Sequence, residues 1–359
     1  MLSAGNGFIM QSEKYSRDNA GQSLKKYILL KKGELAYNHG ASKAKQYGCC
    51  YELTEDEARI PYVYHCFKVS GTEHTPYVAT ALNNPKIDRQ LKRLVSSSVR
   101  MDGLLNISFD DYMSVILHLP SLKEQTYIAD FLKKLDERIT AQEKLVASLK
   151  KYKRGVVRTL LSPKYCSIKN VKWTTSRIGD IGTFIKGAPL SKADISLKGT
   201  PFILYGELYT TYSEVISNVV RKTQASVDKQ YYSQIGDVII PTSGETPEEI
   251  STASCVMLPD IILAGDLNIY RCTQVDGRIM SYILNHVVND RIARIAQGKS
   301  VVHVQAAEIS KIEITYPDPF SQKTIIAILD VISDRIDQSN AELRLLHELR
   351  KALLQKLFI

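Results

Sequence analysis

The sequence predicts an α+β protein with two globular domains, two long helices and an internal pseudo-twofold repeat. Two observations lead to this prediction. A helix-forming segment occurs twice without gaps, 197 residues apart (Pro120 and Pro317), and each copy follows short β-forming runs separated by Gly, Pro, Asp and Thr. The 359 residues are enough for two domains that each bury a core of their own.

The composition is that of a globular protein with a basic balance. Hydrophobic residues make up 44% of the chain, and 47 Lys and Arg against 38 Asp and Glu give a net charge of +9. Such an excess favours a polyanionic partner, above all nucleic acid. No apolar run reaches the roughly 20 residues of a membrane span, and the N-terminus lacks the features of a signal peptide, so we expect a cytoplasmic protein without membrane contact. The six cysteines form no C-x-x-C pair and have no neighbouring His at zinc spacing, so we expect reduced thiols and no metal site.

The repeat is clearest in residues 119–162 and 316–359. Each copy has a Pro at its start, where a strand must end and a helix can begin, so we predict a long helix in each. Chance similarity between two helices would not readily reproduce the matched polar residues in one register. The matched pairs include Pro120 and Pro317, Gln125 and Gln322, Leu132 and Leu329, and Arg138 and Arg335.

Apolar residues recur in both copies at steps of three and four, the pattern of a coiled-coil seam. A polar residue interrupts each stripe near its middle, Gln142 in the first copy and Ser339 in the second. If the helices pair in antiparallel orientation, these two positions approach each other; the alternative is that each helix packs only on its own domain. The predicted helix-pair residues are Ile128, Leu132, Leu135, Ile139, Gln142, Leu149, Ile325, Leu329, Ile332, Ile336, Ser339 and Leu346.

Residues 163–315 form the more complete globular unit, with an irregular β-sheet and a helical stretch from about 280 to 295. Residues 1–118 follow the same plan from their middle onward, because Gly33-Glu34 matches Gly236-Asp237. About 63 residues separate Trp173 from Gly236, whereas only 32 precede Gly33, so we expect the first unit to lack an opening of about 30 residues. The expected strands of the second unit cover 201–205, 236–240, 253–257, 267–270, 301–304 and 312–316.

The order of these elements resembles a known family. A strand, Pro-x-x-x-x-Gln and a long helix that ends in basic and apolar residues, all duplicated behind two variable domains, is similar to the specificity subunit of type I restriction-modification enzymes. The best anchors are residues 120–125, 132–139 and 353–358, together with the Gly-Asp turns at 179–180 and 236–237.

The resemblance implies a division of labour along the chain. Residues 1–118 (shortened) and 163–315 would be target-recognition domains, each reading one half of a bipartite site in double-stranded DNA. The family's two conserved helices, here 119–162 and 316–359, would separate them as a ruler on the order of 60 Å long. The implied partners are DNA, two methyltransferase subunits that dock on the helices, and the restriction (motor-nuclease) subunits that join them.

No catalytic motif is recognisable, so we expect a non-catalytic subunit that carries no cofactor. An amino-methyltransferase would need an Asn/Asp-Pro-Pro-Tyr/Phe motif, and residues 316–320 (YPDPF) only approach it. Gly298-Lys299-Ser300 echoes the end of a phosphate-binding loop, but Ala293 stands where the first glycine is required.

The candidate DNA contacts lie in loops that combine Gly with Lys, hydroxyl and amide side chains. Lys holds phosphates, hydroxyls and amides reach base edges, and Gly lets the backbone approach. Ordinary solvated loops are the alternative. The candidate residues are Lys186, Gly187, Tyr205, Thr242, Ser243, Lys299 and Ser300 in the second unit, and Asn38, Ser42 and Lys43 in the first. The basic helix end, Lys150, Lys151, Lys153 and Arg154, is a candidate for methyltransferase docking or for solvated surface.

Three other functions stay open at this point. The chain could be a coiled-coil adaptor whose globular arms bind proteins, and such an adaptor would not bind random duplex DNA at low salt. It could be the recognition module of a fused restriction-methylation enzyme, which genomic neighbours would reveal. It could also be a silent or degenerate specificity allele, as the short first unit suggests.

Overall fold

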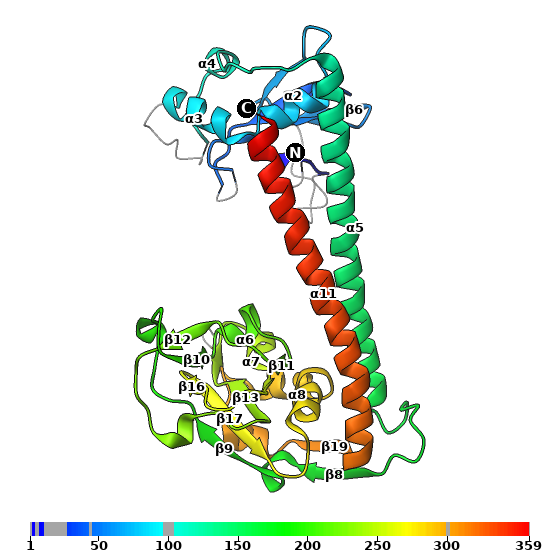
Figure 1. The fold of residues 1–359 in the computed structure, drawn as a ribbon, viewed down its shortest axis with the longest axis vertical. Coiled ribbons are helices and arrows are strands. Elements are labelled where there is room, and N and C mark those ends of the chain that lie inside the picture. Colours follow the sequence, from blue (N-terminus) through cyan, green and yellow to red (C-terminus); the bar gives the residue numbers. More distant parts are fainter. Residues whose placement is uncertain are drawn as a thin grey trace. The chain divides into compact units, whose positions relative to one another are not determined.

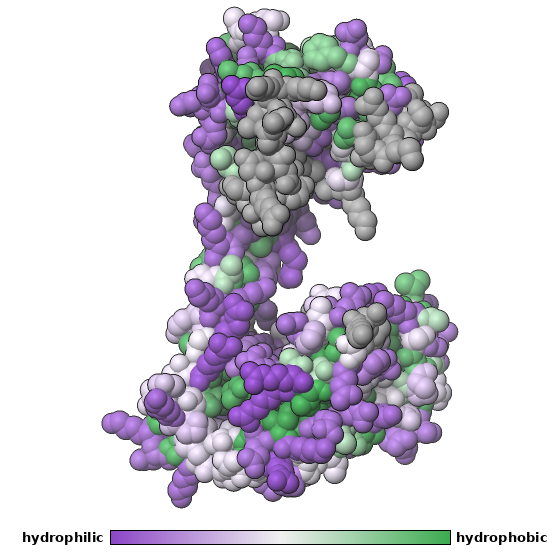
Figure 2. All heavy atoms as spheres, turned by 180° about the vertical axis from the view of Figure 1, so that it is seen from behind, coloured by the Kyte–Doolittle hydropathy of each residue, from purple (hydrophilic) through white to green (hydrophobic). Residues whose placement is uncertain are grey.

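A computed structural model of the chain describes residues 2–3, 7–10, 27–42, 45–95, 104–298 and 302–358. The chain divides into two compact units, which we call unit 1 (Met1–Lys144 with Asn340–Ile359) and unit 2 (Leu145–Ser339). Each unit combines a small β-rich body with parts of both long helices (Figure 1). Hydrophilic and hydrophobic residues are intermingled on the face that Figure 2 shows. Among the described residues, no helix is long and apolar enough to cross a membrane.

Unit 1 is built on a three-stranded antiparallel sheet in the order β5-β4-β7, with two further strand pairs, β3 with β6 and β1 with β2. Leu35 and Tyr37 of β4 share one buried cluster with Ile87 and Leu91 of α3, so this helix covers one face of the sheet. The elements are β1 (Leu2–Ser3), β2 (Gly7–Phe8), β3 (Ile28–Lys31), β4 (Leu35–Asn38), β5 (Cys49–Glu52), β6 (Glu57–Ile60), β7 (His65–Phe67), α2 (Thr75–Ala81), α3 (Pro85–Leu94) and α4 (Phe109–Met113).

Unit 2 contains a five-stranded sheet in the order β11-β15-β13-β17-β9 and a three-stranded sheet in the order β12-β10-β16, with two strand pairs, β14 with β18 and β19 with β8. Its strands are β8 (Trp173–Arg177), β9 (Gly182–Lys186), β10 (Thr200–Leu204), β11 (Val215–Ile216), β12 (Arg221–Thr223), β13 (Asp237–Pro241), β14 (Ser243–Gly244), β15 (Ser254–Val256), β16 (Ile262–Ala264), β17 (Leu267–Cys272), β18 (Val302–His303) and β19 (Glu313–Pro317). Its helices are α6 (Glu207–Thr210), α7 (Pro247–Ile250), α8 (Gly277–His286), α9 (Asn289–Ile295) and α10 (Ala306–Ser310), with 3-10 turns η2 (Ile178–Asp180), η3 (Lys192–Asp194) and η4 (Lys229–Tyr231).

The two units share a central motif, as the repeat in the sequence predicts. In unit 1, β4 lies between β5 and β7; in unit 2, β13 lies between β15 and β17, and all four pairings are antiparallel. The turns before β4 and β13 each contain a glycine with positive φ, Gly33 at 82° and Gly236 at 94°. Other residue types rarely adopt this conformation, which explains why glycine recurs at the matched position.

One predicted element is divided in the structure. The helical stretch expected from about 280 to 295 forms two helices, α8 and α9, which are separated at Val287 and Val288. Consecutive β-branched residues restrict χ1 and weaken a helix locally. Val288 is buried in the core of unit 2, so the chain turns there to bring this side chain inward.

The long helices α5 (Leu122–Leu160) and α11 (Pro319–Leu357) each contain 39 residues. In unit 1, Ala129 and Leu132 near the start of α5 pack with Phe358 just beyond the end of α11. In unit 2, Val157 near the end of α5 shares a buried cluster with Leu329 in the first half of α11. Within each unit the start of one helix therefore meets the end of the other, and the segments are antiparallel (Figure 1).

The predicted seam residues lie on the covered side of the helices. Gln142 belongs to unit 1 and Ser339 to unit 2, and both are buried; their approach to each other stays a prediction. Leu132, Leu135, Ile139, Gln142, Ile325, Leu329, Ile336 and Ser339 are buried, and Ile128, Leu149, Ile332 and Leu346 are half-buried.

The repeated glutamine explains the Pro-x-x-x-x-Gln motif. In unit 2, the side-chain amide of Gln322 donates to the carbonyl of Pro317 (2.8 Å), and its oxygen accepts the backbone N–H of Asp276 (2.8 Å), the N-cap of α8. In unit 1, Gln125 donates to Pro120 (2.9 Å) and accepts the N–H of His74 (3.0 Å), the N-cap of α2. Both glutamines are buried, so each ties the start of a long helix to a helix of the β-rich body.

We predict that Gln322→Ala destabilises the chain. The substitution leaves the amide of Asp276 and the carbonyl of Pro317 without their side-chain partner, which costs about 2 kcal/mol for buried groups. Differential scanning calorimetry should show a lower unfolding midpoint. Gln338→Ala, at an exposed position of the same helix, is the matched control and should leave the midpoint within a degree or so of wild type. Equal midpoints for the two variants would contradict a structural role for the repeated glutamine.

Candidate nucleic-acid interface

Three loops predicted to touch DNA, residues 186–189, 205–207 (the Tyr205 loop) and 242–245 (the Thr242 loop), meet around the turn that joins β16 to β17. The amide of Gly187 donates to the carbonyl of Leu267 (2.8 Å), and the hydroxyl of Ser243 donates to Asp266 (2.8 Å). A Cβ added at Gly265 would lie 3.2 Å from the ring of Tyr205. The structure therefore brings these three loops together around the β16–β17 turn, beside Asp266, which was not among the predicted contacts.

Two of the candidate residues in these loops have structural roles. A Cβ at Gly187 would lie 2.8 Å from the carbonyl oxygen of Gly265, so contact within the protein already requires glycine there. Ser243 is buried, and its hydroxyl is engaged by Asp266. Lys186 is exposed at the end of β9, and Thr242 is half-buried just after β13, so these two are better placed to reach a ligand.

The Tyr205 loop has fixed geometry and an acidic neighbourhood. Glu207 is buried and accepts both the amide of Leu204 (3.1 Å) and the Nε of Arg221 (2.9 Å). Tyr205 packs edge-to-face on Tyr209, with 6.5 Å between ring centroids. Burial, Tyr205 and the nearby Glu249 raise the pKa of Tyr209 to about 12. Tyr209 is therefore a neutral hydroxyl at physiological pH and can both donate and accept hydrogen bonds.

The fourth predicted loop is only partly described. Lys299 and Ser300 lie outside the described residues, so their placement gives no evidence for or against DNA contact. The residues on either side, Gln297 and His303, form a pair of backbone hydrogen bonds. His303 in turn faces Ser243 in the pairing of β14 with β18. The flanks of this loop therefore lie beside the Thr242 loop.

The loop of unit 1 that contains Asn38 and Ser42 follows β4, as the Thr242 loop follows β13, and the two loops share one backbone contact. The carbonyl of His39 accepts the amide of Leu105 (2.8 Å), just as the carbonyl of Thr242 accepts the amide of Val304 (3.1 Å). Asn38 closes the loop by accepting the amide of Gly40 (2.9 Å).

Further along this loop, exposed Ser42 accepts the amide of Lys45 (3.0 Å), whereas Lys43 lies outside the described residues.

His39 is a residue that the sequence did not single out. It is buried, and its ring nitrogens lie 2.9 Å from the carbonyl oxygen of Leu105 and 2.7 Å from that of Val63. Its ring also stacks on that of His65, with centroids 5.0 Å apart. His39 therefore shapes the loop from beneath and is not available to a ligand.

A buried ionic cluster joins α5 to the β-rich body of unit 2. Lys153 donates to Glu214 (2.9 Å), His286 donates to the other carboxylate oxygen (2.7 Å), and the Lys153 ammonium lies 5.1 Å from the centroid of the Tyr282 ring. Burial would raise the pKa of Glu214, but the hydrogen bond from His286 and the charge of Lys153 lower it to about 2. Burial disfavours the charge of Lys153, but Glu214 outweighs this effect and raises the pKa of Lys153.

This cluster changes the interpretation of the basic helix end. Lys153 was a candidate for methyltransferase docking, but it is buried and paired within unit 2. Lys150, Lys151 and Arg154 are exposed and remain candidates. Helical spacing explains the difference, because Lys153 continues the buried stripe that includes Val146 and Val157.

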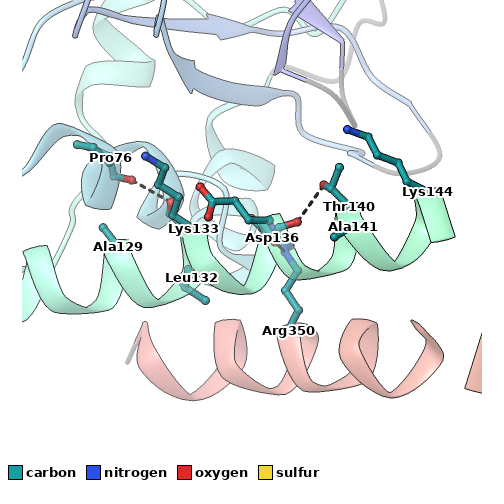
Figure 3. Close-up of a pocket in the computed structure, with 11 residues that line it drawn as sticks. Pro76, Ala129, Leu132, Lys133, Asp136, Thr140, Ala141, Lys144 and Arg350 are labelled. Atoms are coloured by element: carbon teal, nitrogen blue, oxygen red, sulfur yellow. Dashed lines mark hydrogen bonds and ion pairs between the residues drawn. The ribbon is translucent and has the colours of Figure 1, made fainter. Parts of the chain in front are cut away.

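Unit 1 has a pocket of about 630 Å³ between α2 and α5, beside Arg350 of α11 (Figure 3). Arg350 forms a two-pronged ion pair with Asp136 at its edge. At the repeat offset of 197, Arg350 corresponds to Lys153, and Asp136 corresponds to Ser333. The matched basic residue is therefore buried and paired with Glu214 in unit 2, but forms a half-exposed ion pair with Asp136 in unit 1. The other residues lining the pocket are Pro76, Thr80, Ala129, Leu132, Lys133, Glu137, Thr140, Ala141 and Lys144.

Among the residues that the structure describes, no group of three or more His, Cys, Asp or Glu could hold a metal ion. All six cysteines are free thiols. Burial raises the pKa of Cys50 and of Cys255 to about 12, so neither is a reactive thiolate at neutral pH.

Residues 170–347 match the family model described as the type I restriction modification DNA specificity domain. The match includes all the loops of unit 2 discussed above and most of α11. The chain belongs to the type I restriction-modification DNA specificity family. It is the DNA specificity subunit of such a system, which is a non-catalytic component, and this assignment displaces the coiled-coil adaptor suggested as an alternative.

Solved structures with the fold of this specificity subunit support the architecture. One, described as the structural basis underlying complex assembly and conformational transition of the type I restriction-modification system, has a TM-score of 0.59 at 13% identity and covers 92% of this chain and 82% of that one. Another, the S subunit of the type I restriction-modification system from M. genitalium, has a TM-score of 0.56 at 16% identity and covers 93% and 85%. At these identities the likeness shows the fold alone. A comparison with curated protein sequences gives no match.

We predict that Glu214→Gln destabilises the specificity subunit in a pH-dependent way. The pKa of Glu214 is lowered from 4.5 to about 2, so its ionic contacts contribute about 3 kcal/mol at neutral pH, and this contribution is lost as the pH falls from about 4.5 towards about 2. The unfolding midpoint of the variant should lie below that of wild type at pH 7, and the difference should shrink in acid.

Glu308→Gln is the matched control for this experiment, because Glu308 forms an exposed ion pair with Lys311. Its unfolding midpoint should follow that of wild type at every pH. A gap between Glu214→Gln and wild type that stays constant from pH 7 to pH 3 would show that the charge of Glu214 is not the stabilising element.

Proposed function

We propose that this specificity subunit reads a bipartite DNA target with two target-recognition domains, residues 1–118 and 163–315. It would dock two methyltransferase subunits on the segments 119–162 and 316–359. Restriction subunits would join through the methyltransferases. The observation that carries the proposal is the repetition of one structural plan in both units: the three-stranded motif, the loop that follows its central strand, and the glutamine tie to a long helix.

The loops around the β16–β17 turn support reading of one half-site by unit 2. Lys186 supplies a positive charge for a phosphate, whereas Tyr205 and Thr242 offer hydroxyls for base edges. The matched loop of unit 1 contains Asn38 and Ser42, which supports a second reading site there. Nearby Asp266 can accept from a cytosine amino group if a duplex approaches this turn, because carboxylates suit that donor.

Exposed apolar residues on the helices support two equivalent docking sites. Phe131 of α5 (42% exposed) corresponds at the repeat offset to Ile328 of α11 (38%), and Tyr152 of α5 (60%) corresponds to Leu349 of α11 (47%). In unit 1, Leu345 lies one turn from Leu349 on α11; in unit 2, Val331 lies close to Ile328. Large apolar side chains on an outward helix face are typical of a surface covered by a partner. Their repetition fits two copies of one partner.

The first test of this function is methylome sequencing of cells that express the chain with its methyltransferase. A bipartite adenine-methylated motif is expected. Tyr205→Ala or Thr242→Ala should relax or abolish only one half of that motif, because both residues belong to unit 2. As a matched control, Thr174→Ala alters an exposed hydroxyl on β8, away from the loops, and should leave the motif unchanged. A single or palindromic motif would overturn the bipartite assignment.

The second test counts methyltransferase copies. Leu345→Ser with Leu349→Ser should remove the copy that docks on unit 1, so light scattering of the complex should give one methyltransferase per chain where wild type gives two. Arg344→Ala with Glu348→Ala changes exposed polar residues on the same stretch of α11 and should keep two copies. Two copies on the leucine variant would rule out this face as the docking site.

A further inference from the structure

A short turn in unit 2, residues 195–199, holds a leucine fully in solvent. Leu197 is 98% exposed; Ile195 (38%) in the same turn and Val220 (57%), which directly precedes β12, are exposed as well. We call this segment the Leu197 turn. Figure 1 labels β12 and β10 on the left of unit 2. This side lies on the right in Figure 2, which is seen from behind, and hydrophobic atoms project there beside hydrophilic ones. An apolar side chain so exposed gains nothing for the fold.

The Leu197 turn is rigidly built. The amide of Ser196 donates to the carbonyl of Lys222 (2.8 Å) on β12, and the Ser196 hydroxyl donates to the carbonyl of Lys198. Gly199 has a φ of +121°, and a Cβ there would lie 2.1 Å from the carbonyl oxygen of Thr223. Only glycine fits this position, and the close approach locks the turn against β12. Leu197 is therefore presented to solvent by fixed backbone geometry.

Three exposed lysines lie in or beside the turn. Lys198 is part of it, Lys192 lies in η3 just before it, and Lys222 on β12 pairs with Ser196. None of the three forms an ion pair with any residue in the described ranges. Lysines on an edge strand such as β12 also prevent strand pairing between molecules, so the lysines alone would not indicate a ligand. A solvent-exposed leucine between unpaired lysines fits a polyanion with an apolar interior, which is the character of a nucleic-acid groove.

The position of the turn relative to the reading loops supports a duplex. β10 begins at Thr200, beside the Leu197 turn, and ends at Leu204, beside Tyr205. Five residues of strand span about 16 Å. One turn of B-DNA is about 34 Å, so the two ends of β10 lie about half a helical turn apart. A protein surface that faces the major groove at one point faces the minor groove half a turn further along the duplex.

We propose that the Leu197 turn is a second DNA contact of unit 2, in the minor groove about half a turn from the site read by the Tyr205 and Thr242 loops. Lys198 and Lys222 bind phosphates on either side of this groove, and Leu197 wedges against a base step. Apolar wedges of this kind unstack the step and kink the duplex. The inference rests on the proposed function, because it assumes that unit 2 reads DNA.

The lysines are tested by the salt dependence of binding. The full chain, with its methyltransferase, is titrated onto a labelled duplex of about 30 base pairs that contains the methylated motif. Lys198→Ala with Lys222→Ala should weaken binding and reduce the slope of log Kd against log salt by about 2. Lys169→Ala with Lys172→Ala, two exposed lysines near β8, is the matched control and should keep the wild-type slope.

Leu197 is tested by base unstacking. A duplex with 2-aminopurine placed about five base pairs from the half-site of unit 2 should brighten when wild type binds, because the base loses its stacking partner. Leu197→Ala should abolish this rise and weaken binding by less than about tenfold. Val287→Ala, another exposed apolar residue of unit 2, should keep the full rise.

The outcomes separate this inference from the function on which it rests. Sequence-specific binding with an unchanged salt slope in the lysine variant, or an unchanged 2-aminopurine signal in Leu197→Ala, would overturn the second contact and leave the reading function intact. Loss of binding to phosphatidylserine vesicles by the same variants, with DNA binding unaltered, would also overturn it, because the turn would then serve a lipid surface. Failure of wild type to bind any duplex would instead remove the proposed function.

Discussion

The orientation of each long helix depends on one buried side-chain amide. A helix that leaves a β-rich body can point in many directions unless its first turn is tied to that body. Gln125 and Gln322 provide this tie, because an amide can donate to the proline carbonyl behind it and accept the N–H that begins another helix. A carboxylate could not donate, and an ammonium could not accept. Glutamine therefore satisfies two buried backbone groups at once and fixes the direction in which the helix starts.

The allocation of the helices between the units follows from this constraint. Each unit contains the start of the long helix that its own glutamine anchors, together with the end of the other helix. In unit 1 the end of α11 is held by the stacking of Phe358 on Tyr77. In unit 2 the end of α5 is held by Val157, which is buried in the core. Neither unit is therefore a β-rich body joined to a separate helix. The core of each unit includes side chains from both long helices, and so from both halves of the repeat.

The long helices and their covered faces could be predicted because the relevant information is local. A stripe with steps of three and four is visible in about ten residues, and the structure buries or half-buries every predicted seam residue. The hydrogen bonds of the repeated glutamine could not be predicted, because His74 lies 51 residues from Gln125 and Asp276 lies 46 residues from Gln322 in the sequence. The proximity of the loops around the β16–β17 turn and the internal role of Ser243 were not predicted either. A hydroxyl next to glycine has the same local sequence whether it faces solvent or a buried carboxylate such as Asp266.

The repeat preserves backbone geometry more faithfully than it preserves ionic chemistry. At one matched position, unit 2 buries Lys153 against Glu214 and the ring of Tyr282, whereas unit 1 holds Arg350 half-exposed against Asp136. A lysine ammonium is a compact, strongly hydrated charge, so its burial must be compensated by several partners. A guanidinium is more weakly hydrated and pairs with one carboxylate in a planar, two-pronged geometry without deep burial. The two solutions hold equivalent helix segments with different side chains. This tolerance explains how one half of a duplicated recognition protein can diverge in its loops and ion pairs while its helices keep the orientation set by the glutamines.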